Sequence, residues 1–166
     1  MAVRKILLLG NPILRTRCSS VRDFSSRETR RTITDLRDTL ADFRARRGFG
    51  RGIAASQIGS TERIIFIRSR GLGAIINPKI VKRSAAMIEL WDDCFSFPEL
   101  LVKVRRHKTI EISYVNEPGQ RKSLKATDAL SELLQHEIDH LNGVLAIDRA
   151  IRKKDIILRS EWSGSM

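Results

Sequence analysis

Apolar residues recur at intervals of three and four in the first third of the chain, which predicts an amphipathic helix there. Ser25 and Glu28 have the spacing of a capping box at its start, and Gly48 follows its last apolar position. The helix would therefore end before Gly48 and bury one stripe of side chains against the core. The stripe consists of Ile33, Leu36, Leu40 and Phe43.

Shorter apolar runs between glycine-rich and polar turns predict strands. The turn Gly10-Asn11-Pro12 closes the first run, and further turns are expected at residues 71–73 and 116–119. The expected strands are residues 6–9, 63–67, 75–82, 88–91, 101–105 and 109–115.

A second helix is expected from Thr127 or Asp128 to Asn142, because either residue can cap its start and Gly143 can end it in a left-handed conformation. A last helix is expected after Asp148. The order of elements predicts an α+β fold, with small mixed or antiparallel sheets packed around this central helix. We expect residues 1–166 to form a single domain, with residues 149–166 as a basic C-terminal tail.

Composition narrows the class of protein. The chain has 166 residues, 42% of them hydrophobic, and only two cysteines, Cys18 and Cys94, so a disulfide framework is not indicated. We expect a cytoplasmic protein without a signal peptide or membrane span. The net charge is +12, from 31 Lys and Arg against 19 Asp and Glu. The basic residues are spread along the chain, so the charge is interpreted as mostly solvated surface, with contact to RNA or a ribonucleoprotein as the alternative.

The run Gln135-His136-Glu137-Ile138-Asp139-His140 carries the clearest chemistry. Residues i and i+4 share one helix face, so His136 and His140 can bind one metal ion while Glu137 takes a proton from a water. The alternative is an ordinary amphipathic helix with two exposed histidines. The chain has only three histidines, and two of them lie in this motif, which favours the metal site.

A metal ion needs a third ligand, a Cys, His, Asp or Glu from elsewhere in the chain. None follows directly in 141–145, and Asp148 is interpreted as a helix cap. Cys94 lies upstream. A lone cysteine is usually a small buried apolar residue, and Cys18 is interpreted so.

The chain resembles the peptide deformylase family in three ordered blocks. Residues 50–57, Gly-Arg-Gly-Ile-Ala-Ala-Ser-Gln, match the family's Gly-x-Gly-hydrophobic-Ala-Ala-x-Gln. Residues 93–96, Asp-Cys-Phe-Ser, correspond to its Glu-Gly-Cys-Leu-Ser element, and residues 135–143 match its histidine motif in full. The residues from 6 to 15 also look like the family's N-terminus, so the resemblance covers about residues 3 to 150.

The resemblance implies a metal-dependent amidohydrolase that removes the N-formyl group from N-formylmethionyl nascent peptides. It implies Fe²⁺ or Zn²⁺ as the single divalent metal, with Ni²⁺ or Co²⁺ as replacements, and Glu137 as general base. The side-chain amide of Gln57 and the backbone N–H of Phe95 would stabilise the oxyanion. The metal ligands would be Cys94, His136 and His140, and the substrate-binding residues Gly50, Arg51, Gly52, Asp93, Glu132 and Leu133.

The chain departs from the family beside these blocks. Asp92-Asp93 replaces Glu-Gly before the cysteine, and we expect Arg105 to pair with Asp92. Arg51 and Glu132 stand where the apolar pocket for the methionine side chain would be expected. Either they pair with each other and shrink the pocket, or they bind a polar substrate, or both turn to solvent. We therefore hypothesise that another N-formyl compound is a better substrate than N-formylmethionyl peptides.

Three other functions are weighed against a deformylase. An HExxH protease would lack its downstream ligand, and a catalytically weak binding protein would have kept Glu137 and Gln57 without using them. A basic RNA-binding module is the third. The basic tail has five Lys and Arg against one acid between residues 149 and 159, which makes contact with the ribosome a further expectation.

Overall fold

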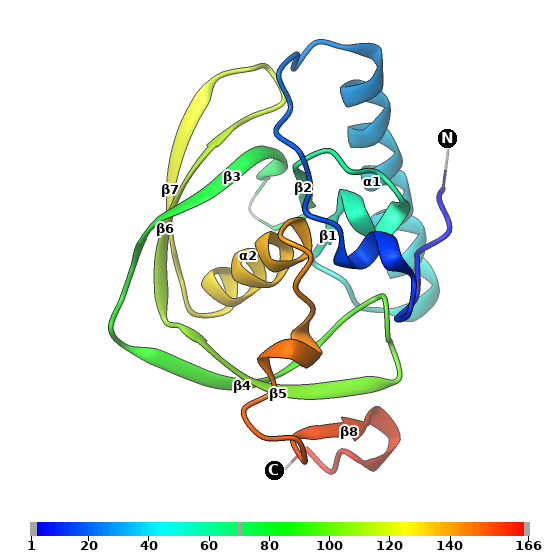
Figure 1. Ribbon diagram of the computed structural model, residues 1–166, viewed down its shortest axis with the longest axis vertical. Coiled ribbons are helices and arrows are strands. Elements are labelled where there is room, and N and C mark those ends of the chain that lie inside the picture. Colours follow the sequence, from blue (N-terminus) through cyan, green and yellow to red (C-terminus); the bar gives the residue numbers. More distant parts are fainter. Residues whose placement is uncertain (1–2, 70, 165–166) are drawn as a thin grey trace.

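Two antiparallel sheets enclose a central helix in the computed structural model, which describes residues 3–69 and 71–164 (Figure 1). The five-stranded sheet has the order β1-β2-β3-β6-β7 and the three-stranded sheet the order β4-β5-β8. The predicted α+β class is confirmed. The strands are β1 (Gly52–Ala54), β2 (Ile64–Ile67), β3 (Gly73–Arg83), β4 (Met87–Asp93), β5 (Leu100–His107), β6 (Thr109–Val115), β7 (Arg121–Thr127) and β8 (Ile156–Leu158).

The two helices cover opposite faces of the five-stranded sheet. Side chains alternate along a strand, so Ile64 of β2 packs in the core under α1 (Arg27–Arg47), whereas Ile65 packs in the core under α2 (Asp128–Leu141). The alternation continues in β3. Burial on both faces explains why the middle of the sheet is continuously apolar in sequence.

Helix α1 has the predicted apolar stripe, and its four residues are all buried. Full burial of each such side chain contributes roughly 1.5–3 kcal/mol. The helix begins one residue later than predicted, because Ser26 rather than Ser25 accepts the hydrogen bond from Thr29 N. Gly48 ends it with φ +78°, as expected for a left-handed cap.

Helix α2 lies between the two sheets (Figure 1), and every residue from 131 to 141 is buried. Thr127 is its N-cap residue but makes no side-chain capping bond, and Asn142 and Gly143 end it as predicted. Gly143 has φ +73°, and a Cβ there would collide with the backbone of Arg15. This burial fixes the rotamers of the side chains that α2 presents to either side.

Four elements differ from the predictions. Residues 6–9 form no strand, because Leu7 N donates to Gln57 O and Leu9 N to Ser96 O, two partners from different segments. In place of the predicted last helix, the described residues after Asp148 form β8, which pairs with β5, and the short 3-10 turn Arg159–Glu161. Strands β1 and β7 were not predicted, since β1 lies in a glycine-rich segment and β7 is a mostly polar edge strand.

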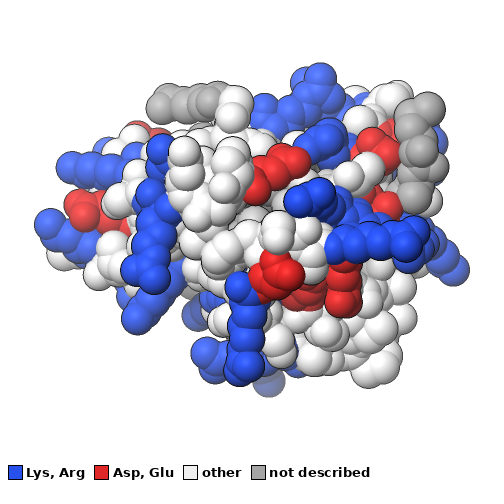
Figure 2. Space-filling model, turned by 90° about the horizontal axis from the view of Figure 1, so that it is seen from above, with Lys and Arg blue, Asp and Glu red and all other residues white. Residues whose placement is uncertain are grey.

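Charge on the surface is dispersed. Figure 2 shows one face on which basic side chains surround uncharged areas, with a smaller group of acids between them. In the part of the chain that the structure describes, no helix is long and apolar enough to cross a membrane.

Candidate active site

Helix α2 and the end of β4 bring three metal-binding atoms together. Cys94 Sγ lies 3.2 Å from His140 Nε2, which lies 3.2 Å from His136 Nε2. All three atoms lie within 4.8 Å of one another and all three residues are buried. One thiolate and two imidazoles are a donor set typical of zinc or iron sites.

Asp92 fixes the orientation of one of these imidazoles. Its Oδ1 lies 2.9 Å from His136 Nδ1, so Nδ1 donates and Nε2 presents its lone pair to the other donors. The buried guanidinium of Arg106 donates to Asp92 Oδ2 over 2.8 Å. The prediction that Arg105 pairs with Asp92 was wrong, because Arg105 points to the opposite face of β5 and pairs with Glu89.

The arrangement fits a bound cation. The Nε2 atoms of His136 and His140 and the sulfur of Cys94 face one another, and neutral imidazoles beside a thiolate can share only a proton or a metal ion. Asp92, Glu132 and His136 also lie within reach of a common ion. The Asp92 oxygens are already engaged by His136 and Arg106, so this second set is the weaker one.

Glu137 lies beside these donors without a fixed partner. Its Oε2 has no hydrogen bond among the described residues, and burial raises the pKa of Glu137 to about 7. Burial alone would also raise the pKa of Asp92, but the hydrogen bond from His136 and the charge of Arg106 hold it well below its ordinary value. The surroundings therefore raise the pKa of Glu137 and lower that of Asp92, so Glu137 binds a proton more readily than Asp92 does.

Glycines allow the loop before β1 to approach the site. A Cβ at Gly52 would lie 2.8 Å from Glu137 Oε1, so this position has no room for a side chain. Gly50 has φ +124°, and a Cβ there would lie 2.7 Å from Phe95 Cζ. The backbone of this loop therefore forms one wall of the site.

Gln57 is held with its amide nitrogen toward the cysteine. Its Oε1 accepts from Ala54 N over 2.9 Å, while Nε2 lies 3.6 Å from Cys94 Sγ and 3.3 Å from Ser96 Oγ. The side chain is buried in the short 3-10 turn Ala55–Ile58, which fixes its rotamer. A preorganised donor of this kind can stabilise negative charge that develops on a substrate oxygen.

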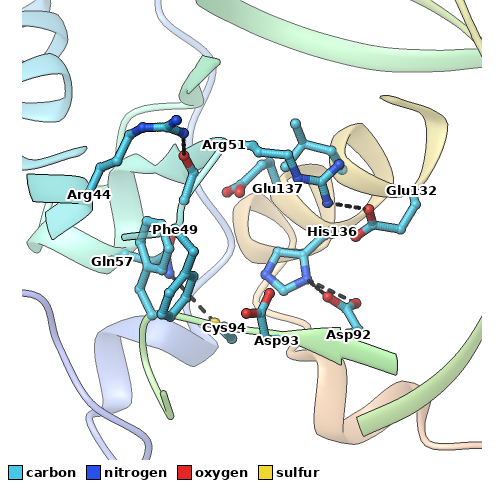
Figure 3. Close-up of a pocket in the computed structure, with 14 residues that line it drawn as sticks. Arg44, Phe49, Arg51, Gln57, Asp92, Asp93, Cys94, Glu132, His136 and Glu137 are labelled. Atoms are coloured by element: carbon cyan, nitrogen blue, oxygen red, sulfur yellow. Dashed lines mark hydrogen bonds and ion pairs between the residues drawn. The ribbon is translucent and has the colours of Figure 1, made fainter. Parts of the chain in front are cut away.

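These groups open into a pocket of about 360 Å³ (Figure 3). Every substrate-binding residue predicted from sequence lines it, as do Gln57, Phe95 and Glu137. His140 is not among the lining residues, because it lies deeper. The predicted substrate-binding residues that line the pocket are Gly50, Arg51, Gly52, Asp93, Glu132 and Leu133.

Arg51 and Glu132 form an ion pair across the pocket (Figure 3), with 2.6 Å between Nη2 and Oε2. The Glu132 side chain is 7% exposed and that of Arg51 47%. Burial raises the pKa of Glu132, and the charge of Arg51 works in the other direction. Of the three alternatives, the structure shows the mutual pair, and Glu132 does not turn to solvent.

Sequence patterns missed the rim of the pocket. Phe49 and Arg44 line it, and Arg159 from the tail lies over the Phe49 ring, 4.9 Å from its centroid. Arg159 Nη2 also donates to Asp93 Oδ2 over 2.8 Å. The tail therefore folds back to the pocket. The signal available in sequence was only an arginine more than sixty residues from its partner, and no local spacing reports such a contact.

Comparison with known proteins agrees with this geometry. A family model described as polypeptide deformylase matches residues 3–155. A peptide deformylase of Parafrankia sp. is 37% identical, over 99% of this chain and 90% of its own. Peptide deformylase 2 of Nostoc sp. is 34% identical, over 95% of this chain and 91% of its own. The crystal structure of the Thermotoga maritima enzyme superposes with a TM-score of 0.84 at 32% identity, covering 92% of this chain and 100% of that one.

The fold and site thus define a metal-dependent hydrolase of the α+β class. The chain belongs to the peptide deformylase family. It is a hydrolase that acts on N-formyl peptides.

Proposed function

We propose that Cys94, His136 and His140 hold one divalent ion, and that Glu137 is the general base for hydrolysis of the formamide. The convergence of the three donor atoms within 4.8 Å, with His136 oriented by Asp92, carries this assignment. Fe²⁺ and Zn²⁺ both suit the donor set, and Ni²⁺ or Co²⁺ would replace them. When bound, such an ion acidifies water and polarises a carbonyl oxygen.

The protein's own groups would then act in sequence. Glu137 accepts the proton of the attacking water and later gives it to the leaving amine nitrogen. Gln57 Nε2 and the backbone N–H of Phe95 donate to the oxygen of the tetrahedral intermediate, and loss of one such donor costs about 2.7–4 kcal/mol of barrier. Gly50 and Gly52 let the peptide backbone of the substrate lie against the loop before β1.

The structure also supports a proposal on substrate preference. The Arg51–Glu132 pair adds polar groups to the pocket wall, with Glu132 almost fully buried. A thioether side chain placed against this pair would desolvate it without replacing its hydrogen bonds to water. We infer that N-formyl peptides with a short or hydrogen-bonding first side chain are preferred over N-formylmethionyl peptides.

Cobalt substitution tests the ligand assignment. A thiolate–cobalt charge-transfer band is expected in the Co²⁺ protein and should disappear in Cys94→Ser. Cys18→Ser is the matched control: Cys18 is the other buried free cysteine and packs in a different apolar cluster from Cys94. A band that persists in Cys94→Ser, or disappears in Cys18→Ser, would refute the assignment.

Three expectations from the sequence stay predictions. Contact with the ribosome is supported by the net charge of +12, but the tail is a strand rather than a helix, and Arg159 is engaged at the pocket. Co-sedimentation with ribosomes at increasing salt tests it. A cytoplasmic location and a single-domain chain are likewise proposed from the sequence.

A further inference from the structure

A second cleft, here called the rear cleft, lies on the opposite face of α2 from the catalytic pocket. Its volume is about 460 Å³, and α2 contributes Gln135, Ile138 and Asp139 to it rather than Glu137 and the metal-site histidines. The other walls come from the loop before Cys18, from Arg63 immediately before β2, from β3, β4 and β5, and from the turn after α2. The cleft lies within the range of volumes of small-molecule sites.

The charged groups of the rear cleft are almost all cationic. Seven Arg and Lys side chains line it, against one carboxylate, Asp139. Asp139 is already shared by Arg106 and Arg149, each 2.8–2.9 Å away, and Arg105 pairs with Glu89. The remaining cations form no ion pair with any described residue; they are Arg17, Arg63, Lys79 and Arg83.

Arg63 is held rigidly but is not neutralised. Its guanidinium donates to the carbonyl oxygens of Pro78 and Leu141 and to Asn142 Oδ1, at 2.9–3.3 Å. These acceptors satisfy its hydrogen bonds but carry no full charge. Burial lowers the pKa of Arg63, and the like charge of Arg17 lowers it further. Positive charge is therefore concentrated here at a cost that a bound anion would offset.

Arg106 adds a buried positive charge to the wall of the rear cleft. Its side chain is 3% exposed, it lines the rear cleft, and its Nε has no hydrogen-bond partner among the described residues. Unpartnered buried donors are rare in folded proteins. This nitrogen is buried behind the wall, so the cations that are open to the cleft, and not this N–H, are the groups that a ligand would meet.

We propose that the rear cleft binds a phosphate-bearing anion, held by Arg63 immediately before β2 and by the cations of β3 and of the loop before Cys18. Guanidinium groups pair with phosphate oxygens in a bidentate manner, and several oxygens are needed to engage cations that come from separate segments. A single carboxylate has too few acceptors for this set. The phosphate could belong to a small polyphosphate compound or to an RNA backbone.

Isothermal titration calorimetry with tripolyphosphate tests the proposal on the intact protein. We expect binding at about 50 mM salt that weakens at about 200 mM, because counterions are released. The double variant Arg17→Gln/Arg83→Gln should weaken it at least tenfold. Both side chains are exposed, so the fold should persist, which a thermal melt would verify.

The matched control is Arg121→Gln/Lys122→Gln, which removes the same charge from exposed positions of the edge strand β7. It should change the affinity less than twofold. A single-stranded oligoribonucleotide, titrated in parallel, separates the two sources. Tighter binding with a steeper salt dependence indicates an RNA backbone, and weaker binding a small polyphosphate. Absence of binding by both ligands, or equal losses in the cleft and control variants, would overturn the proposal.

Discussion

The guanidinium of Arg51 and the carboxylate of Glu132 form an ion pair of 2.6 Å in the wall of the catalytic pocket, although they lie 81 residues apart. The resemblance to the family predicts apolar residues at both positions. The pair therefore changes what the pocket can accept while leaving the catalytic groups in place.

Replacing both residues should restore an apolar pocket. We expect Arg51→Ile/Glu132→Ile to raise kcat/KM for formyl-Met-Ala-Ser relative to formyl-Gln-Ala-Ser by about tenfold, since a buried methylene or two is worth about 1–3 kcal/mol. The ratio of the two kcat/KM values is the measurement. The double variant Arg37→Gln/Glu117→Gln, which removes an exposed ion pair, is the control and should leave the ratio unchanged. An unchanged ratio in the pocket variant would contradict the role of the pair.

Breaking the pair on one side should be costly in stability. Arg51→Ile leaves the carboxylate of Glu132 almost fully buried and without its ion-pair partner. Glu132→Ile leaves the guanidinium of Arg51 half-exposed to solvent. We therefore expect Arg51→Ile to lower the free energy of unfolding by about 1–3 kcal/mol and Glu132→Ile by less. Urea unfolding of both variants checks the order. If both variants lose the same free energy of unfolding, Arg51 does little to stabilise the buried carboxylate of Glu132.

Asp92 should control metal affinity without being a ligand. Asp92→Asn keeps the shape but removes the charge that orients His136 and compensates Arg106. Losing such an outer partner typically costs about 10–100-fold in metal affinity. Competition with a chelator measures this, with Glu89→Gln, the exposed partner of Arg105 on the same strand, as the control. Affinity that stays within twofold of the original would show that His136 is oriented by packing alone.

Gly52→Ala should separate catalysis from metal binding. The added methyl group would lie 2.8 Å from Glu137 Oε1 and from Ile67 Cδ1, so Glu137 must move. A displacement of about 1 Å can cost about 100-fold in rate. We expect kcat to fall by about that factor while the metal content per chain stays the same. An unchanged kcat in Gly52→Ala would show that catalysis does not depend on the position that Glu137 has in this structure.

The tail should influence substrate binding more than chemistry. Arg159 contacts both Asp93 and the Phe49 ring at the rim, away from the three donor atoms. Arg159→Gln is therefore expected to raise KM several-fold with little change in kcat. Arg152→Gln, which breaks a local pair with Asp155 in the same tail, is the matched control. A fall in kcat at constant KM would contradict a role limited to the rim.

Much of this site could be predicted from sequence because its chemistry is local. The two histidines and Glu137 lie on one helix, where a spacing of four residues fixes their relation. The stripe of α1 was predicted for the same reason. The family resemblance added Cys94, which no spacing connects to the histidines.

Contacts between distant segments were not predictable in this way. Arg106 rather than Arg105 reaches Asp92 because neighbouring residues of β5 point to opposite faces, and the sequence does not state which face is inward. The tail after Asp148 was expected to be helical, but pairing of residues 156–158 with β5 overrides local propensity. Residues 6–9 are apolar like a strand, yet their backbone partners come from the 3-10 turn at Gln57 and from the loop at Ser96.

The most direct test of the central claim is formate release by protein purified without oxygen and analysed for metal, with Glu137→Gln as the control. The account predicts release from N-formyl peptides that is lost in Glu137→Gln, while its metal content is unchanged. It also predicts a higher kcat/KM for formyl-Gln-Ala-Ser than for formyl-Met-Ala-Ser. Metal-loaded protein that releases no formate from either peptide, or equal release by Glu137→Gln, would contradict the proposed site. Rapid release with formyl-Met-Ala-Ser as the better substrate would keep the site and refute the role of the Arg51–Glu132 pair.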